Sequence, residues 1–191
     1  MILEVVKYGH PVLRERGSRV KEITPEVTRL VGDMFETMYD AKGIGLAAQQ
    51  VGVALQLTVI DVRGITDRPS TLEVNGAPAD VDTFMPLVLI NPKIIPVGAP
   101  VAGPEGCLSF PEIYADITRS EQVDVKALNA KGEPLAFRAG GLLGRAIQHE
   151  VDHLNGVLFI DRMTPEDKAE LRAEIDDLHT ATKKALTRKN R

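Results

Sequence analysis

Residues Gln148–Gly156 read QHEVDHLNG, and the rest of the chain is best understood around this stretch. His149 and His153 are four residues apart, so on an α-helix their side chains lie on one face, about one turn apart. Both imidazoles can then reach one metal ion, while Glu150 lies beside that ion without binding it. This is the HExxH arrangement, in which two histidines bind a metal and the glutamate transfers protons.

A surface helix that carries two histidines and some acids by chance would give the same letters. The residues before the motif favour a buried helix instead, because apolar side chains recur there at helical spacing: Leu142, Leu143, Ala146 and Ile147. Gly156 stands where a left-handed glycine would end the helix. A buried helix needs partners for two histidines and a glutamate, and a metal ion would supply one.

The composition is that of a soluble, globular protein, with 191 residues, 43% of them hydrophobic and 26% charged. The net charge of -4 gives no general basic surface for nucleic acid, so we expect no DNA partner. The N-terminal residues do not resemble a signal peptide, and no stretch is long and apolar enough to span a membrane. We therefore expect one domain over residues 1–191, located in the bacterial cytoplasm.

Two amphipathic helices are expected. Thr24-Pro25-Glu26 is typical of a helix start, and apolar residues then recur at three- and four-residue steps until Lys42-Gly43. Thr164-Pro165 begins a last helix over about residues 164–188. The basic end of that helix is either a solvated terminus or a local contact with an RNA-rich partner such as the ribosome.

The strands are expected to be short. Leu55–Val62 and Leu87–Ile90 have strand patterns, and Asn91-Pro92 should end the second. Residues 122–128 and 135–137 indicate an antiparallel hairpin. Residues 63–86 indicate a polar loop with a short hairpin around Asn75-Gly76, and residues 96–104 an irregular stretch.

The segment Gly43–Gln50 reads GIGLAAQQ and carries little side-chain bulk. It fits a tight turn packed beneath a helix. It fits equally well a backbone that a ligand must approach closely. Phosphate is a poor candidate for that ligand, because neither a Gly-Lys-Ser/Thr nor a GxGxxG motif is present.

Cys107, in the segment EGCLS, is the one cysteine of the chain, which excludes an internal disulfide. It must be a buried filler, a nucleophile or a metal ligand. A thiolate with two histidines is a known catalytic ligand set with one open position. Gly106 allows close approach, and no suitable third ligand follows His153. A Cys–His nucleophile pair would leave Glu150 and one histidine without a role.

The segments GIGLAAQQ, EGCLS and QHEVDHLNG, in this order, resemble the three motifs of the peptide deformylases. The similarity runs from the N-terminal YGHPVLR through the last helix, and the three motifs together are specific although HExxH alone is not. The resemblance implies an α+β fold of mostly antiparallel sheets packed around a central metal-binding helix, with a C-terminal helix. It also implies a monomeric enzyme that removes formyl from the N-formylmethionine of nascent polypeptides and releases formate.

The resemblance implies a metal, usually Fe²⁺, with zinc, nickel or cobalt as substitutes. Its ligands would be Cys107, His149 and His153, with water in the fourth position. Glu150 would take a proton from that water and return it to the departing amine. The side-chain amide of Gln50 and the backbone N–H of Leu108 would stabilise the oxyanion.

The resemblance also implies where the substrate binds. The peptide would lie as an extended strand near Ile44, Gly45 and Gly106. Its methionine side chain would enter an apolar pocket that includes Ile44, Leu142 and Ala146. Two features differ from the compact members of the family: the segment at residues 63–86 is longer, and Arg145 stands where an apolar residue also occurs in relatives.

Two other functions fit parts of the sequence. A zinc peptidase would share the HExxH helix, but it would not need EGCLS and would usually bring its third ligand from downstream. A metal-stabilised module that docks on a ribosome through its basic tail would need no Glu150 and would close its metal shell with four protein ligands. An assay on formylated and unformylated peptides separates these from a deformylase.

Overall fold

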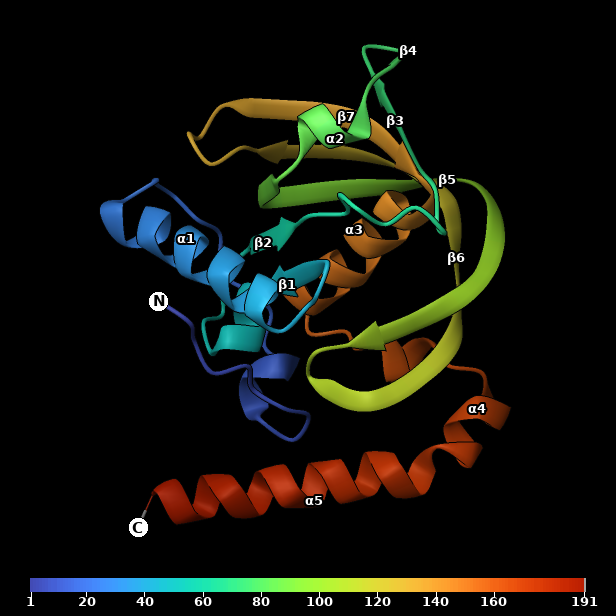
Figure 1. Cartoon of the computed structure of the whole chain (residues 1–191). Coiled ribbons are helices and arrows are strands. Elements are labelled where there is room, and N and C mark those ends of the chain that lie inside the picture. The colour runs from blue at the N-terminus through green and yellow to red at the C-terminus, as the bar shows by residue number, and fades with distance from the viewer. Residues whose placement is uncertain (191) are drawn as a thin grey trace.

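A seven-stranded antiparallel sheet runs through the computed structural model, which describes residues 1–190 (Figure 1). The strands follow the order β1-β2-β5-β6-β7-β3-β4. Their bounds are β1 Gly45–Ala47, β2 Leu57–Ile60, β3 Ser70–Val74, β4 Ala77–Pro78, β5 Leu87–Cys107, β6 Phe110–Leu128 and β7 Pro134–Gly140. With the helices, this confirms the expected α+β fold with a mostly antiparallel sheet.

Five α-helices and three 3₁₀ turns complete the described residues. The α-helices are α1 Pro25–Asp40, α2 Val81–Phe84, α3 Gly141–Leu154, α4 Pro165–Glu170 and α5 Arg172–Lys189. The 3₁₀ turns are η1 Pro11–Arg14, η2 Ala48–Val51 and η3 Phe159–Arg162. The last predicted helix is thus divided at Leu171 into α4 and α5. In Figure 1, α5 lies across the lower end of the molecule, away from α1.

Helix α1 forms as its sequence predicts. The Thr24 hydroxyl accepts a hydrogen bond from the Val27 backbone N–H, and Pro25 occupies the first turn, where no helical N–H partner is lost. Met34 and Met38 are fully buried against β1 and β2. The helix therefore holds the short strand β1 in place.

The hairpin β5–β6 is much longer than the sequence suggested. The predicted end of a strand at Asn91-Pro92 is wrong, because β5 continues to Cys107. A bulge lies between the Ile90 and Lys93 pairs, and Asn91 there has a φ of 52°. A bulge tolerates a proline that cannot donate a ladder hydrogen bond. The side chain of Asn91 instead exchanges two hydrogen bonds with the backbone of Val20.

The stretch at residues 96–104 is likewise a strand, where an irregular segment was expected. Beyond Ile90, β5 pairs with β6 alone, so one of its edges is open. Prolines are tolerated on an open edge because their missing N–H would have faced solvent. Figure 1 shows this hairpin curving around the side of the molecule. Cys107, the last residue of β5, lies beside α3, with its Sγ 3.3 Å from Nε2 of His153.

Helix α3 packs against several strands, including β1, β3 and β6. Its Leu143 and Ile147 are fully buried, and His149, Glu150 and His153 are buried as well. The first turn is capped from the 63–86 segment: Leu142 N–H donates to the Pro69 carbonyl and Leu143 N–H to the Ser70 hydroxyl, each at 3.0 Å. The predicted hairpin at Asn75-Gly76 in that segment is confirmed as β3–β4.

Candidate metal centre

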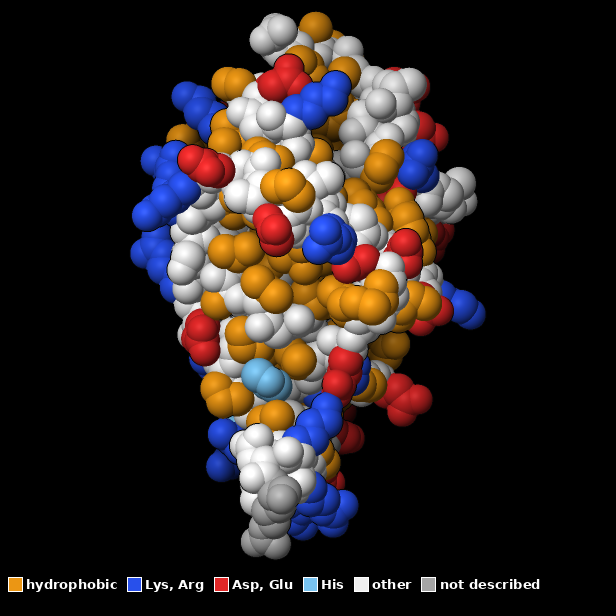
Figure 2. Space-filling model, turned by 90° about the vertical axis from the view of Figure 1, so that its left-hand side faces the viewer, with side chains coloured by type: hydrophobic (Ala, Val, Ile, Leu, Met, Phe, Trp, Pro, Cys, Tyr) orange, Lys and Arg blue, Asp and Glu red, His pale blue; other side chains and the backbone are white. Residues whose placement is uncertain are grey.

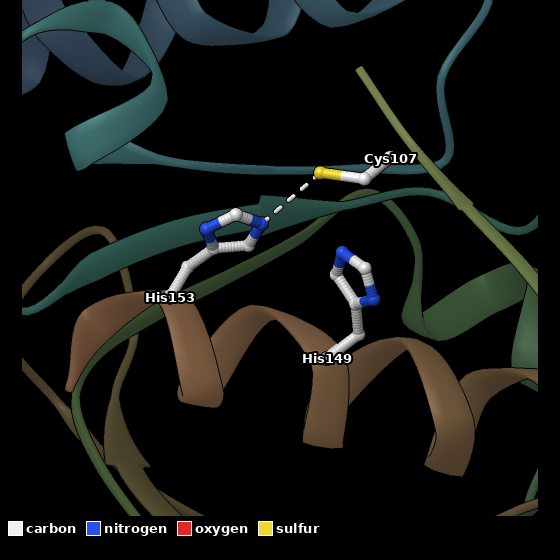
Figure 3. Close-up of side chains that lie close together, drawn as sticks. All are labelled: Cys107, His149 and His153. Atoms are coloured by element: carbon white, nitrogen blue, oxygen red, sulfur yellow. Dashed lines mark hydrogen bonds between the residues drawn. The ribbon is translucent and has the colours of Figure 1, made fainter. Parts of the chain in front are cut away.

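Three side chains from two distant parts of the chain meet beside α3 (Figure 3). Both imidazoles point from α3 toward Cys107 at the end of β5. Sγ of Cys107 lies 3.3 Å from Nε2 of His153, and the candidate ligand atoms of Cys107, His149 and His153 all lie within 4.8 Å of one another. Ligands of a tetrahedral ion are about 3.3–3.6 Å apart, so only a small adjustment is needed.

The local backbone explains how Cys107 reaches the helix. The pairing of β5 with β6 shifts register between Gly106 and Cys107, which turns the strand end away from a regular ladder. The backbone carbonyl of Ser109 accepts a hydrogen bond from the Tyr8 backbone N–H, so the N-terminal segment holds the turn between β5 and β6. The cysteine is half-buried, unlike the fully buried histidine His153.

Glu105 orients His149. Its Oε1 lies 2.8 Å from Nδ1 of His149, and Arg119 donates two hydrogen bonds to the same carboxylate at 2.6 and 2.9 Å. Burial alone would raise the pKa of Glu105, but the hydrogen bonds from His149 and Arg119 lower it to about 2. An ionised carboxylate can only accept, so Nδ1 of His149 carries a proton. Burial lowers the pKa of His149, but its hydrogen bonds to Cys107 and Glu105 raise it to about 10, so a metal would bind at Nε2 by displacing the second proton.

His153 is held as a neutral base. Burial, followed by the charge of His149, keeps the pKa of His153 well below its usual value. A neutral imidazole is the form that binds metal ions. Among residues 1–190, Nδ1 of His153 has no hydrogen-bond partner, although it is buried.

Glu150 is a buried acid that forms no ion pair among residues 1–190. Burial raises its pKa to about 7, and the nearby charge of His149 opposes this rise. Its Oε2 is buried without a hydrogen-bond partner in the described part of the chain. A carboxylate in that state is suited to exchange protons near neutral pH.

Gln50 and Leu108 flank Cys107. Oε1 of Gln50 accepts from the Ala47 backbone N–H at 2.9 Å, which fixes the amide orientation. Its Nε2 then lies 3.5 Å from Sγ of Cys107 and 3.2 Å from the Ser109 hydroxyl. Leu108 follows Cys107, and its carbonyl accepts a hydrogen bond from Lys7. The amide donor of Gln50 is therefore aimed at the sulfur side of the site.

A pocket of about 620 Å³ opens beside these groups. All five residues predicted to contact the substrate line it: Ile44, Gly45, Gly106, Leu142 and Ala146. The residues predicted for metal binding and catalysis line it too, with the exception of His153, which is placed by its contact with Cys107.

Sequence reasoning missed the ionic support of the site. Glu105 lies within the EGCLS segment, and its position two residues before Cys107 could have indicated that it lies near the site. Arg119 carried no local signal, because only the pairing of β5 with β6 brings it to Glu105. Arg145 was noted as unusual, and it bonds Glu105 at 2.9 Å and the Ile117 carbonyl at 2.6 Å.

The donor set fits a metal ion. One soft sulfur and two imidazole nitrogens converge, with one ring locked by Glu105 and the other kept neutral by burial. The unpartnered carboxylate oxygen of Glu150 is the buried polar atom that a cation and a water molecule would satisfy.

The chain is similar to known proteins over nearly its whole length. Residues 2–169 match the model of the family described as polypeptide deformylase. A peptide deformylase of Methylacidiphilum infernorum is 47% identical over 93% of each chain, and one of Opitutus terrae is 42% identical over 97% of each. The crystal structure of a peptide deformylase from Legionella pneumophila matches with a TM-score of 0.77 and 36% identity, over 93% of this chain and 95% of that one.

Proposed function

The chain belongs to the polypeptide deformylase family, and on that premise we propose that Cys107, His149 and His153 hold its metal ion and that Glu150 is its general base. The family consists of metal-dependent hydrolases that remove the formyl group from the N-terminus of nascent polypeptides. The observation that carries the proposal is the convergence of one cysteine sulfur and two imidazoles within 4.8 Å, beside a buried carboxyl group with an unpartnered oxygen.

In this proposal α3 is the central metal-binding helix of the fold, with Cys107 as the ligand from β5. A bound divalent ion would polarise the formyl oxygen and make a water molecule more acidic. The ligand set suits Fe²⁺, zinc, nickel or cobalt, and we propose Fe²⁺ as the native ion, with the others as substitutes. A thiolate beside a redox-active ion is open to oxidation, so loss of activity in air would support iron.

Glu150 provides the proton transfers. Its raised pKa keeps the carboxylate able to accept a proton from water and to donate it to the departing amine at neutral pH. The unpartnered Oε2 gives that proton a place to reside. Two other donors would stabilise the negative charge that develops on the formyl oxygen: Nε2 of Gln50 and the backbone N–H of Leu108.

The substrate would bind as an extended strand between two edges of the pocket. Ile44 and Gly45 belong to one edge and Gly106 to the other, and all three line the pocket. Leu142 and Ala146, from the first turns of α3, would contact the methionine side chain together with Ile44. The apolar character of these side chains suits a thioether.

The partner of the enzyme would be the ribosome-bound nascent chain. Four exposed basic residues lie toward the end of α5: Lys183, Lys184, Arg188 and Lys189. Figure 2 shows Lys and Arg side chains at the lower end of the molecule, near the C-terminal end of α5. We propose that this end contacts ribosomal RNA. Arg191, which belongs to the same basic run, lies outside the described residues.

Within residues 1–190, no helix combines the length and apolar character needed to cross a membrane. We further propose a single catalytic domain over residues 1–191 that acts as a monomer in the bacterial cytoplasm and binds no DNA.

The test is metal analysis of anaerobically purified protein, coupled to formate release from formyl-Met-Ala-Ser. We expect about one metal ion per chain, formate release, and no cleavage of unformylated Met-Ala-Ser. Glu150→Gln should keep its metal and lose the activity. Cleavage of the unformylated peptide would favour a peptidase. A fully active Glu150→Gln variant would overturn the assignment of the base.

A further inference from the structure

Two of the basic side chains that line the pocket carry no ion pair within the described residues. The Lys and Arg residues that line the pocket are Lys7, Lys42, Arg68 and Arg145. Lys7 and Arg145 are already engaged: the first donates to the Leu108 carbonyl, and the second donates to Glu105 and to backbone carbonyls. Lys42 and Arg68 have no carboxylate within 4.0 Å among residues 1–190, so their charges are available to a ligand.

Arg68 is held in place by the segment that carries it. The next two residues cap the first turn of α3, through the Pro69 carbonyl and the Ser70 hydroxyl. Arg68 is half-buried as a residue, and its Nη2 donates to the Pro104 carbonyl at 3.0 Å. Its remaining N–H groups make no hydrogen bond within the described residues. The cation is therefore pre-organised at the pocket, and a bound ligand need not order it.

Lys42 lines the same pocket from a different part of the chain and is also fixed at its backbone. It has a φ of 57°, its N–H donates to the Tyr39 carbonyl, and the N–H of Gly43 donates to the Met38 carbonyl. Lys42 directly precedes Gly43 and Ile44, which form one proposed substrate edge. On the other side, Pro104 is two residues from Gly106, the second proposed edge.

The charge balance at this mouth is positive. Of the acids that line the pocket, Glu105 is compensated by Arg119, Arg145 and His149, and Glu150 lies at the reacting end. Glu112 is the exposed acid at the mouth, against the two cations Lys42 and Arg68. Both cations thus line the pocket in which the proposed peptide substrate would bind.

We propose that Arg68 and Lys42 select formyl-methionyl peptides that carry an acidic side chain at the second or third position. This inference rests on the proposed function and deepens it. It gives the 63–86 segment a role: the segment caps α3 and carries a specificity-determining cation to the mouth of the pocket. The preference should be expressed in KM, because the charges lie away from the reacting formyl group.

The experiment compares formyl-Met-Xaa-Ser and formyl-Met-Ala-Xaa peptides in which Xaa is Glu, Gln or Lys. For the wild-type enzyme at low salt we expect kcat/KM to be about 3- to 5-fold higher for Glu than for Gln at one of the two positions, and lower again for Lys. The ratio should shrink toward one at high salt, since exposed charges are screened. Equal values for Glu, Gln and Lys at low salt would overturn the proposal.

Substitutions at Arg68 and Lys42 test whether the preference comes from the charges of these two side chains. Arg68→Gln removes the charge and keeps a polar side chain, so the Glu/Gln ratio should fall toward one. Arg68→Glu and Lys42→Glu should reverse the preference toward Lys. Arg29→Glu, on the exposed face of α1, is the control for overall charge and should leave the ratio unchanged. An unchanged ratio in the Arg68 and Lys42 variants would contradict the proposal.

Failure of this inference can be told apart from failure of the proposed deformylase function. If wild-type protein releases formate from no peptide, the proposed function fails. The charge preference is then decided by anisotropy of labelled peptides that carry Glu or Lys at the second position (Met-Glu-Ser, Met-Lys-Ser) or the third (Met-Ala-Glu, Met-Ala-Lys), and equal affinities within both pairs would overturn it. If Arg68→Glu does not fold, Lys42→Glu and the salt series with the wild-type enzyme still decide.

Discussion

Gly45 and Glu150 are packed so closely that no side chain fits between them. A Cβ atom on Gly45 would lie 2.5 Å from Oε1 of Glu150 and 3.0 Å from its Cγ. Strand β1 therefore lies directly against the proposed general base. The small residues of GIGLAAQQ thus let β1 approach the proposed general base, in addition to any approach by a peptide.

Gly45→Ala should lower kcat and not only raise KM. The added methyl group must push Glu150 or β1 aside, and a displacement of about 1 Å at a catalytic group can cost about 100-fold in rate. Steady-state kinetics with formyl-Met-Ala-Ser separates the two constants. The sequence alone led us to expect that a larger residue, such as in Gly45→Val, would act through substrate affinity, so a change confined to KM would support that simpler view.

The matched control for this variant is Gly32→Ala. Gly32 lies within α1, and a Cβ there would meet no atom within 4 Å. This change should leave kcat and KM unaltered and slightly favour the helix. An equal loss of kcat in both variants would indicate a general loss of folding.

Glu150→Gln should stabilise the metal-free protein while abolishing activity. The pKa of Glu150 is raised from 4.5 to about 7 in the folded state, so the folded protein binds this proton more tightly than the unfolded chain. Stability is therefore lost as pH rises between these two values, and above pH 7 the folded state carries a buried, unpartnered charge. Removing that charge should add about 2–3 kcal/mol to the free energy of unfolding at pH 8.

Denaturant unfolding of metal-free protein at pH 4.5 and pH 8 measures this effect. The gain should appear at pH 8 and vanish at pH 4.5. Glu22→Gln, at an exposed position before α1, serves as the control and should show no such difference. Equal stability of wild type and Glu150→Gln at pH 8 would mean that the carboxylate has a partner.

The sequence predicted the centre of the site better than its surroundings. His149, Glu150 and His153 follow from local helical spacing, and Cys107 from the need for a third ligand. Local periodicity also predicted α1, α3 and the β6–β7 hairpin. These features depend on neighbouring residues, which a single sequence displays directly.

The features that were missed depend on distant pairing. The continuation of β5 through Asn91-Pro92 depends on a bulge and on Val20, which lies 71 residues away. The link from Arg119 to Glu105 exists only because β6 returns beside β5. Arg68 reaches the pocket because β3 pairs with β7 and Ser70 caps α3. None of these contacts leaves a periodic trace in the sequence.

The activity should fall as the pH falls, with an acid limb at or below pH 7. Glu150 must be unprotonated to accept a proton, and its raised pKa of about 7 sets the upper bound of that limb. A bound cation would favour the carboxylate and move the limb lower. The measurement is kcat/KM against pH from 8 to 4 with the metal content checked at each point. A profile that stays flat over this whole range at constant metal content would exclude Glu150 as the titrating base.

Glu105→Gln should weaken metal binding about 10- to 100-fold, although Glu105 is not a ligand. The ionised carboxylate forces the proton of His149 onto Nδ1. A Gln amide can donate to Nδ1 instead, which would place the proton on Nε2, where the metal must bind. Competition with a chelator measures the affinity, and circular dichroism must show that the variant is folded, because Arg119 and Arg145 lose part of their counter-charge. Glu133→Gln, remote in the β6–β7 turn, is the control. A Glu105→Gln protein that is folded and binds metal as tightly as wild type would show that the tautomer of His149 is set by something other than Glu105.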